Sequence, residues 1–512
     1  MASTRNEKSA RNIVYIIWKQ VFLLLLNFFA KTVFIKVLGK EYLGLNGIFN
    51  NIFLLFSFAE FGMGTAMIYS FYEPFARQER EKCAALYQYF RKLYWFMSVG
   101  FVAAGLLVVP FLSIIVDVRM PMEKVILFYL LYMAGSFLNN LFLYKANLLV
   151  ADQNQYIVSK IQLLVECLAF TAQIIVVWVW ESFELYIGII ILKYIGMGIL
   201  YHLKVRKLYP YVEMTAEELS ETEKREIQDN TKTLFIYKFS KTLINATDNI
   251  IISMLVGTVW VGLYSNYEFV IAGIWSIITA LFSALSASVG NLLVEKDREK
   301  QHRIYCVIEM LNIWCGGFTA VCLAVLFQDF IELWVGKGYE LSVPVMLVIV
   351  LNYYLRCLRE GIAMFREAAG LFRRFKNVTV ITAALNISLS FLMGHFWGIG
   401  GIFAATVVSV LVTYFWYEPY LVYKELFQRS VKPYFIRQAK HIAATLLMGT
   451  FVFLLCGKLP SGRIDSFIMK GVCCVLLPNL FFLLYFRKTE QFSILMEQAK
   501  DLVKKRKGKH GE

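Results

Sequence analysis

Charged residues and prolines are scarce in this sequence. Only 17% of its 512 residues are charged and nine are proline, whereas about a quarter of the residues in soluble domains are charged. A soluble chain of this length would fold as several domains joined by polar linkers, and no stretch rich in proline and serine separates such domains here. The sequence therefore excludes an ordinary soluble multidomain protein.

Motifs for metal binding and nucleotide hydrolysis are also missing. The nine cysteines lie mostly in apolar stretches, without a CxxC pair or a cysteine–histidine cluster, which indicates buried thiols. Neither the GxxxxGK[ST] pattern nor HExxH occurs, so ATP-driven transport and zinc proteolysis have no support. We expect a protein that is not an enzyme and that needs no metal or organic cofactor.

Long apolar runs make up most of the chain. Hydrophobic residues reach 58%, and each long run can cross a hydrocarbon core of about 30 Å. Helices are the only spans that fit, because a β-barrel would show alternating strands of about ten residues. The sequence predicts an all-α polytopic membrane protein with about fourteen transmembrane helices. These are expected at 13–37, 43–72, 88–116, 123–147, 156–180, 184–205, 233–256, 261–293, 304–327, 341–365, 377–396, 399–423, 440–457 and 465–486.

Lysine and arginine alternate between the predicted loops. One set of loops, with both termini, holds 37 of these residues, and the other set holds six. Positive residues gather on the cytoplasmic side of membrane proteins, so we expect both termini in the cytoplasm. The net charge of +15 then reflects topology and attraction to anionic membrane lipids, and we expect no nucleic-acid partner.

A glycine motif occurs twice, 218 residues apart. Gly39-Lys-Glu-Tyr-Leu-Gly44-Leu45 follows the first expected helix, and Gly257-Thr-Val-Trp-Val-Gly262-Leu263 follows the seventh. If this is not a chance match, it predicts two parallel six-helix lobes with a ligand site between them. The expected organisation is an N-terminal lobe (1–205), a cytoplasmic linker (206–232), a C-terminal lobe (233–430), two further helices (431–490) and a basic cytoplasmic tail (491–512).

Polar side chains share single faces of several expected helices, at about 100° per residue. Ionisable residues at membrane depth are costly and usually functional. The candidate ligands for an anion are Lys31, Lys241, Arg356 and Arg359. The candidate gate or ion-coupling residues are Glu60, Asp248 and Glu268. The candidate polar lining consists of Asn46, Asn50, Gln162, Glu166, Asn245, Asn249 and Asn352.

Two interpretations of these faces stay open. Polar and small faces can hold membrane helices together, and the cations can form internal salt bridges with Glu60, Asp248, Glu268 or Glu360. Alternatively, the faces line a hydrated, net cationic cavity that binds an anionic substrate.

The expected helices 233–256 and 261–293 carry a family-like pattern. It reads Thr247-Asp248-Asn249-Ile250-Ile251-Ile252-Ser253, then Gly257, then Val261-Gly262-Leu263-Tyr264-Ser265-Asn266-Tyr267. This pattern resembles that of bacterial polysaccharide flippases, the Wzx-like branch of the multidrug/oligosaccharidyl-lipid/polysaccharide (MOP) exporter superfamily. The stretch 39–64, which ends Ala59-Glu60-Phe61-Gly62-Met63-Gly64, is similar to the same family.

The resemblance implies a flippase of the bacterial cytoplasmic membrane. Its substrate would be an undecaprenyl-pyrophosphate-linked oligosaccharide for capsule, exopolysaccharide or cell-wall polysaccharide, with polysaccharide polymerase and export proteins as partners. Alternating access would be driven by a proton or sodium gradient or by the membrane potential. The alternatives are a MATE-type drug or cation antiporter, whose cavity should be acidic, a lipid II flippase, and a membrane-embedded glycosyltransferase or polymerase of the same pathway.

Overall fold

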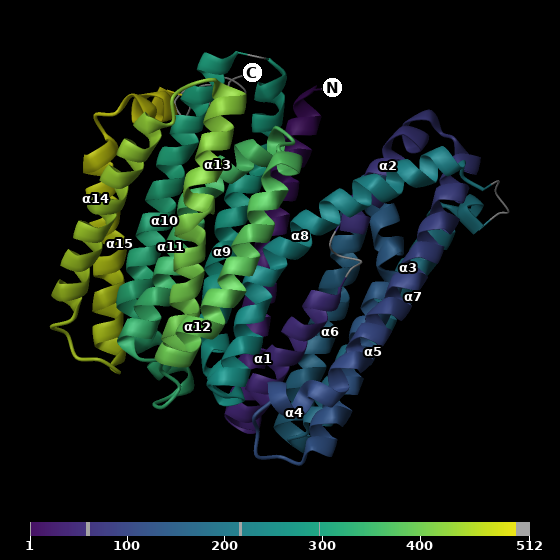
Figure 1. Cartoon of the computed structure of the whole chain (residues 1–512), viewed down its shortest axis with the longest axis horizontal. Helices are drawn as coiled ribbons and strands as arrows, with labels where there is room; N and C mark the ends of the chain where they lie inside the picture. The colour runs from purple at the N-terminus through teal and green to yellow at the C-terminus, as the bar shows by residue number, and fades with distance from the viewer. Residues whose placement is uncertain (1, 58–61, 214–217, 296, 498–512) are drawn as a thin grey trace. The chain divides into compact units, whose positions relative to one another are not determined.

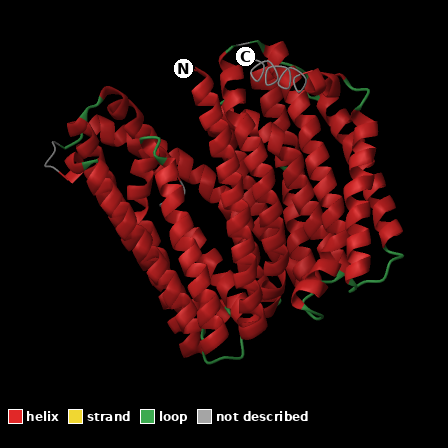
Figure 2. Cartoon of the chain, turned by 180° about the vertical axis from the view of Figure 1, so that it is seen from behind, coloured by secondary structure: helices red, strands yellow, loops and turns green. Residues whose placement is uncertain are grey.

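Helices account for nearly all of the structure. The computed structural model describes residues 2–57, 62–213, 218–295 and 297–497, and these ranges contain no strand (Figures 1 and 2). Long helices follow the long apolar runs because a backbone in lipid must satisfy its own hydrogen bonds. The predicted all-α class is confirmed.

Two compact units divide the chain, Met1–Ser265 and Asn266–Glu512. The boundary falls inside helix α9 (Thr258–Val294). Unit 1 holds α1 (Ala2–Phe56), α2 (Gly64–Arg77), α3 (Arg80–Val108), α4 (Leu112–Ile115), α5 (Met122–Ala151), α6 (Gln155–Trp180), α7 (Phe183–Leu208) and α8 (Glu221–Leu255). The predicted division into six, six and two helices stays a prediction.

The centre of unit 1 is the packing of α5 against its neighbours. Helix α5 lies beside α7 and α3, and α6 lies between α7 and α1 (Figure 1). A buried aromatic and aliphatic core joins α2, α3, α5 and α7 and includes Phe90, Tyr94 and Leu148. This core fixes the helices that carry the polar residues discussed below.

The segment predicted as an inter-lobe linker is ordered where it is described. It includes the short 3-10 helix η3 (Pro210–Glu213) and the first turns of α8. Ser220 forms a capping box with Glu223, and Lys82 lies 3.0 Å from the Glu223 carboxylate. The hydrogen bonds from Lys82 and Ser220 lower the pKa of Glu223 to about 2, because they stabilise its charged form.

Unit 2 is built around α10 (Arg298–Val335). Its other helices are α11 (Val343–Ala368), α12 (Phe372–Val412), α13 (Tyr414–Val422), α14 (Lys432–Cys456) and α15 (Ile464–Phe486), with a π-turn η4 (Tyr423–Phe427) after α13. Helix α10 contacts α11, α14 and α15, and α11 contacts α12 and α13. The last two helices are therefore attached to the unit through α10.

Two buried ion pairs reinforce that attachment. Arg437 of α14 lies 3.0 Å from Glu309, and Lys470 of α15 lies 2.6 Å from Asp329. Glu309 and Asp329 lie on α10 about 30 Å apart along its axis. Each of the last two helices is thus tied to α10 at a different level.

Ten segments of the described residues are long and apolar enough to cross a membrane. Helices α8 and α11, expected as spans, are not among them. Both carry polar faces, and polar faces lower the mean hydropathy of a helix that can be shielded by its neighbours. The protein is a multi-pass membrane protein, and the number fourteen stays a prediction.

Positive φ angles mark the first glycine of each repeated motif. Gly39 has φ 82° and interrupts α1. Gly257, its counterpart in the second copy, has φ 122° and separates α8 from α9. Side chains strongly disfavour this backbone region, so glycine is required at both positions.

Inside unit 1, the second glycine of each motif packs against the other copy of the motif. A Cβ added at Gly44 would lie 2.3 Å from the carbonyl oxygen of Thr258. A Cβ added at Gly262 would lie 2.6 Å from the carbonyl oxygen of Lys40. Lys40 and Thr258 are also 218 residues apart, so the contact is reciprocal, as across a twofold axis. This reciprocity gives the repeated motif a physical reason beyond chance.

Candidate functional site

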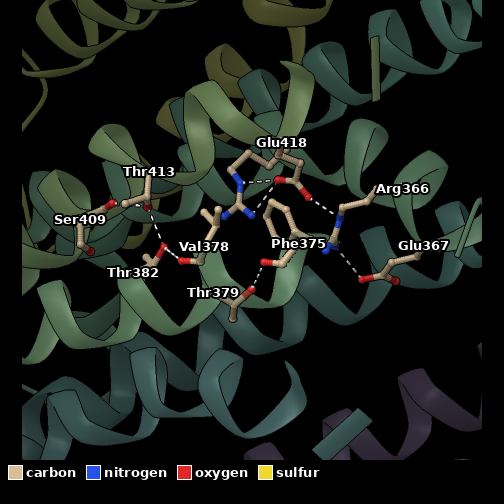
Figure 3. A network of polar contacts seen from close by, with 10 residues as sticks. Arg366, Glu367, Phe375, Val378, Thr379, Thr382, Ser409, Thr413 and Glu418 are labelled. Atoms are coloured by element: carbon tan, nitrogen blue, oxygen red, sulfur yellow. Dashed lines mark hydrogen bonds and ion pairs between the residues drawn. The ribbon is translucent and has the colours of Figure 1, made fainter. Parts of the chain in front are cut away.

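A charged network joins α11 to α13 in unit 2 (Figure 3). Glu418 is fully buried, and Arg359 donates to its Oε2 from Nε and Nη2 at 2.9 and 2.8 Å. Arg366, also buried, places Nε 2.9 Å from Oε1 of Glu418 and Nη2 3.0 Å from Glu367. Such pairing is needed because each ion removed from water costs several kcal/mol.

Aromatic rings lie against the three arginines of this region. The guanidinium carbon of Arg359 is 4.1 Å from the ring centre of Tyr414, and that of Arg366 is 4.1 Å from Phe375. Arg356, exposed on α11, lies 3.9 Å above the ring of Trp275. A cation–aromatic contact contributes about 0.5–1 kcal/mol at an exposed site and about 2 kcal/mol when desolvated, so these rings help to hold each guanidinium in place.

Buried hydroxyl groups continue the network along α12 (Figure 3). The side chains of Thr382 and Thr413 are 2.7 Å apart, and Thr413 donates to the Ser409 carbonyl. Asn386 donates to Thr406 Oγ1 at 2.8 Å. The paired residues converge on Gly398, where φ is 57°, so α12 consists of two helices folded back on each other at that glycine.

Two buried oxygen atoms of α12 have no hydrogen-bond partner among the described residues. They are Asn386 Oδ1 and Ser390 Oγ, one helical turn apart, on side chains with no exposed surface. An unsatisfied buried acceptor costs about 1–3 kcal/mol. Atoms of this kind are therefore candidates for binding a cation with oxygen ligands.

In unit 1, the predicted ligand Lys31 lies on α1. Its Nζ donates to the carbonyl oxygen of Ser265 at 2.6 Å. Asn50 donates to Asn46 Oδ1 at 3.1 Å, and Tyr132 hydrogen-bonds to the same oxygen. Lys31 thus meets a backbone carbonyl, a contact that the sequence did not predict.

The other predicted residues of unit 1 lie on α6 and α8. Asp248 and Asn249 are buried, whereas Gln162 and Glu166 are half-buried on α6. Gln162 is hydrogen-bonded to Tyr201 of α7. Glu60 and the side chains of Lys241 and Asn245 lie outside the described residues.

In unit 2, three predicted residues share helix α11. Asn352 donates to the Phe403 carbonyl at 2.9 Å, and Arg356 and Arg359 follow on the same helix. Glu268 is exposed on α9. Each unit thus holds part of the predicted set, and a single cavity formed by both parts stays a prediction.

Sequence reasoning missed the acidic partners in unit 2. Glu418 was not a candidate, although it binds two arginines. Glu309 and Asp329 were missed as well, and each pairs with a cation of α14 or α15. A signal was available for Glu309 and Glu418, because a carboxylate inside a predicted span usually pairs with a cation or faces a cavity. Asp329 lies two residues beyond the expected span 304–327.

Known proteins resemble this chain in structure and not in sequence. No protein-family model and no curated protein sequence matches the chain, whereas several solved structures do. A multidrug-resistance MATE transporter of the MOP superfamily in an inward-facing conformation has TM-score 0.62 and 14% identity, over 77% of this chain and 93% of that one. The chain has the fold of MOP-superfamily transporters.

Two further structures with this MOP transporter fold differ in function. The lipid II flippase MurJ, inward closed, has TM-score 0.66 and 13% identity over 93% of this chain and 99% of that one. A mutant of the Vibrio cholerae MATE transporter VcmN has TM-score 0.52 and 13% identity over 83% and 100%. Identities this low establish the fold alone, so the substrate must be argued from the site.

Proposed function

We propose that this protein is a flippase for a lipid-linked oligosaccharide with an anionic pyrophosphate head group. The observation that carries the proposal is the arginine set of α11, with Arg356 exposed above Trp275. Trp275 also lies 6.4 Å from Tyr353, ring to ring. A guanidinium binds phosphate oxygens, and neighbouring aromatic rings can stack on sugars.

The same residues disfavour an exporter of cationic drugs. Such an exporter needs acidic groups facing its substrate, whereas α11 exposes the guanidinium of Arg356 and Glu418 is fully buried and engaged by Arg359 and Arg366. In this proposal Arg356 binds the pyrophosphate, and Glu418 holds Arg359 on the same helix, α11. Lys31 and Lys241 of unit 1 stay predicted ligands of the anionic head group. The substrate of a lipid II flippase also carries a pyrophosphate. The charge of the site therefore does not distinguish the two kinds of flippase, and the sugar of the substrate does.

Substitution of Arg356 tests the proposal. We expect Arg356→Ala to abolish polysaccharide export in a strain that lacks the chromosomal gene, because the phosphate loses a charge-assisted bond. Arg374→Ala is the matched control, since Arg374 is an exposed arginine of α12 that pairs with Glu425. Protein level and membrane insertion should be normal in both variants. Full export by both Arg356→Ala and Lys241→Ala would rule the proposal out, and rescue of a strain depleted of its lipid II flippase would favour that substrate.

We also propose that a monovalent cation, sodium, drives the cycle from a site on α12. Asn386 Oδ1 and Ser390 Oγ supply two buried oxygens without partners in the described structure, and Thr406 lies beside Asn386. Oxygen ligands on interrupted helices suit sodium. The acidic residues Asp248 and Glu268 remain the proposed gate or coupling residues, with protons as the alternative ion.

Sodium should therefore stabilise the purified protein. We expect the Tm to rise more in sodium chloride than in choline chloride, and Ser390→Ala to remove that difference. Ser409→Ala is the control, because the Ser409 hydroxyl is equally buried but already donates to the Thr406 carbonyl. Equal Tm values in the two salts for the wild type would exclude the sodium site.

A further inference from the structure

Lys145 is a buried cation in unit 1 that the proposed function does not use. It lies on α5, six residues before the C-terminal end of that helix, and only 8% of the residue is exposed. Lysine is almost never this buried unless it is paired. Its position therefore calls for a partner.

Two aromatic rings of α5 lie beside the ammonium group. It lies 4.9 Å from the ring centre of Phe142, about one turn earlier on α5, and 5.6 Å from that of Tyr144. Side chains on a helix lean toward its N-terminus, so both rings are neighbours that the helix itself supplies.

The described residues offer Lys145 no carboxylate within ion-pair distance and no hydrogen-bond acceptor. Tyr87 of α3 lies 5.3 Å from Tyr144, ring to ring, and Arg91, an exposed residue, follows Tyr87 by one helical turn. Lys145 lies beside Tyr144, and Arg91 is on the face of α3 that carries Tyr87, so this pair of tyrosines links the two cations.

Ring contacts alone do not account for this burial. Cation–aromatic contacts contribute about 0.5–2 kcal/mol each, whereas removing an ammonium ion from water costs several kcal/mol. An anion in the place of the missing carboxylate would offset this difference. An ammonium and a guanidinium beside tyrosine hydroxyls offer the donors that a phosphate group takes.

We propose that Lys145 and Arg91 form an anion subsite within unit 1 that binds a phosphate group. Its two cations lie on α3 and α5, and the proposed function uses neither of them. The inference rests on the proposed function only for the natural source of the phosphate. Binding is tested without transport, so either proposal can fail while the other stands.

The probe is inorganic pyrophosphate, added to the full-length protein in an uncharged detergent. We expect pyrophosphate to raise the Tm of the wild type, and Lys145→Met to weaken the apparent affinity at least about tenfold, the loss of about 1.4 kcal/mol. Lys145→Arg should retain binding because it keeps the charge. Lys160→Met is the matched control, since Lys160 is an exposed lysine near the start of α6 that stacks on Tyr156.

A second experiment, with lipid vesicles, identifies the source of the phosphate. Vesicles of phosphatidylglycerol and of phosphatidylcholine are compared for the same variants. A Lys145-dependent rise in Tm with phosphatidylglycerol but not with pyrophosphate assigns the subsite to a lipid head group. Unchanged affinity of Lys145→Met for both probes, or equal losses in Lys145→Met and Lys160→Met, would overturn the proposal. If Lys145→Met fails to fold, Arg91→Gln takes its place and the same outcomes decide.

Discussion

Replacing Glu418 by glutamine should destabilise the protein by about 3–5 kcal/mol, since breaking a buried ion pair leaves an uncompensated charge. Glutamine keeps the size of the side chain but removes the charge that Arg359 and Arg366 both contact. Arg366 is only 2% exposed, so its charge would stay buried with Glu367 as its remaining carboxylate. The effect should appear as a large drop in Tm of the detergent-purified protein and as loss of export.

Glu425→Gln provides the comparison for that result. Glu425 of η4 pairs with Arg374, whose side chain is 58% exposed, and exposed pairs contribute about 0–1 kcal/mol. This variant should keep nearly the wild-type Tm. A Glu418→Gln variant as stable as Glu425→Gln would show that the arginines of α11 do not depend on Glu418.

The Asp329–Lys470 pair should give the second large effect. Both side chains are 5% exposed and their charged atoms are 2.6 Å apart, beside an apolar cluster that includes Val321, Val452 and Cys474. Asp329→Leu leaves the Lys470 ammonium buried without its carboxylate, at a cost of about 3–5 kcal/mol. Loss of the α15 attachment should follow, measured as a lower Tm and faster proteolysis near residue 460.

The double variant Asp329→Leu/Lys470→Met separates charge from packing. Buried ion pairs can often be replaced by apolar residues of similar volume without loss of stability. We therefore expect the double variant to recover most of the wild-type Tm. If the double variant is as unstable as the single one, the shape of the two side chains matters and their charges do not.

The helical fold was predictable because the signal is local. Long apolar runs such as 156–180 and 465–486 correspond closely to α6 and α15. The break between the first two expected spans was predictable, because Gly39 interrupts α1 between them. The end of α1 at Phe56, inside the expected span 43–72, was not.

The partners of the polar residues were not predictable from one helix at a time. Grouping residues by helical face selected Arg359, but the face of α11 contains no information about Glu418 on α13. Lys31 shows the same limit, because a backbone carbonyl such as that of Ser265 leaves no mark in the residue pattern. Partners across helices depend on packing angles, which the sequence of a single helix does not encode.

The reciprocal glycine contact also affects how the chain is made. Gly44 cannot meet Thr258 until the ribosome has synthesised more than 200 further residues. At about 5–20 residues per second, the first motif would wait about 10–45 s in the membrane before its counterpart emerges. During that interval a helix surface shaped for close backbone contact is open to lipid or to another helix. Chaperones or insertases that shield membrane helices would then matter most for this early segment of the chain.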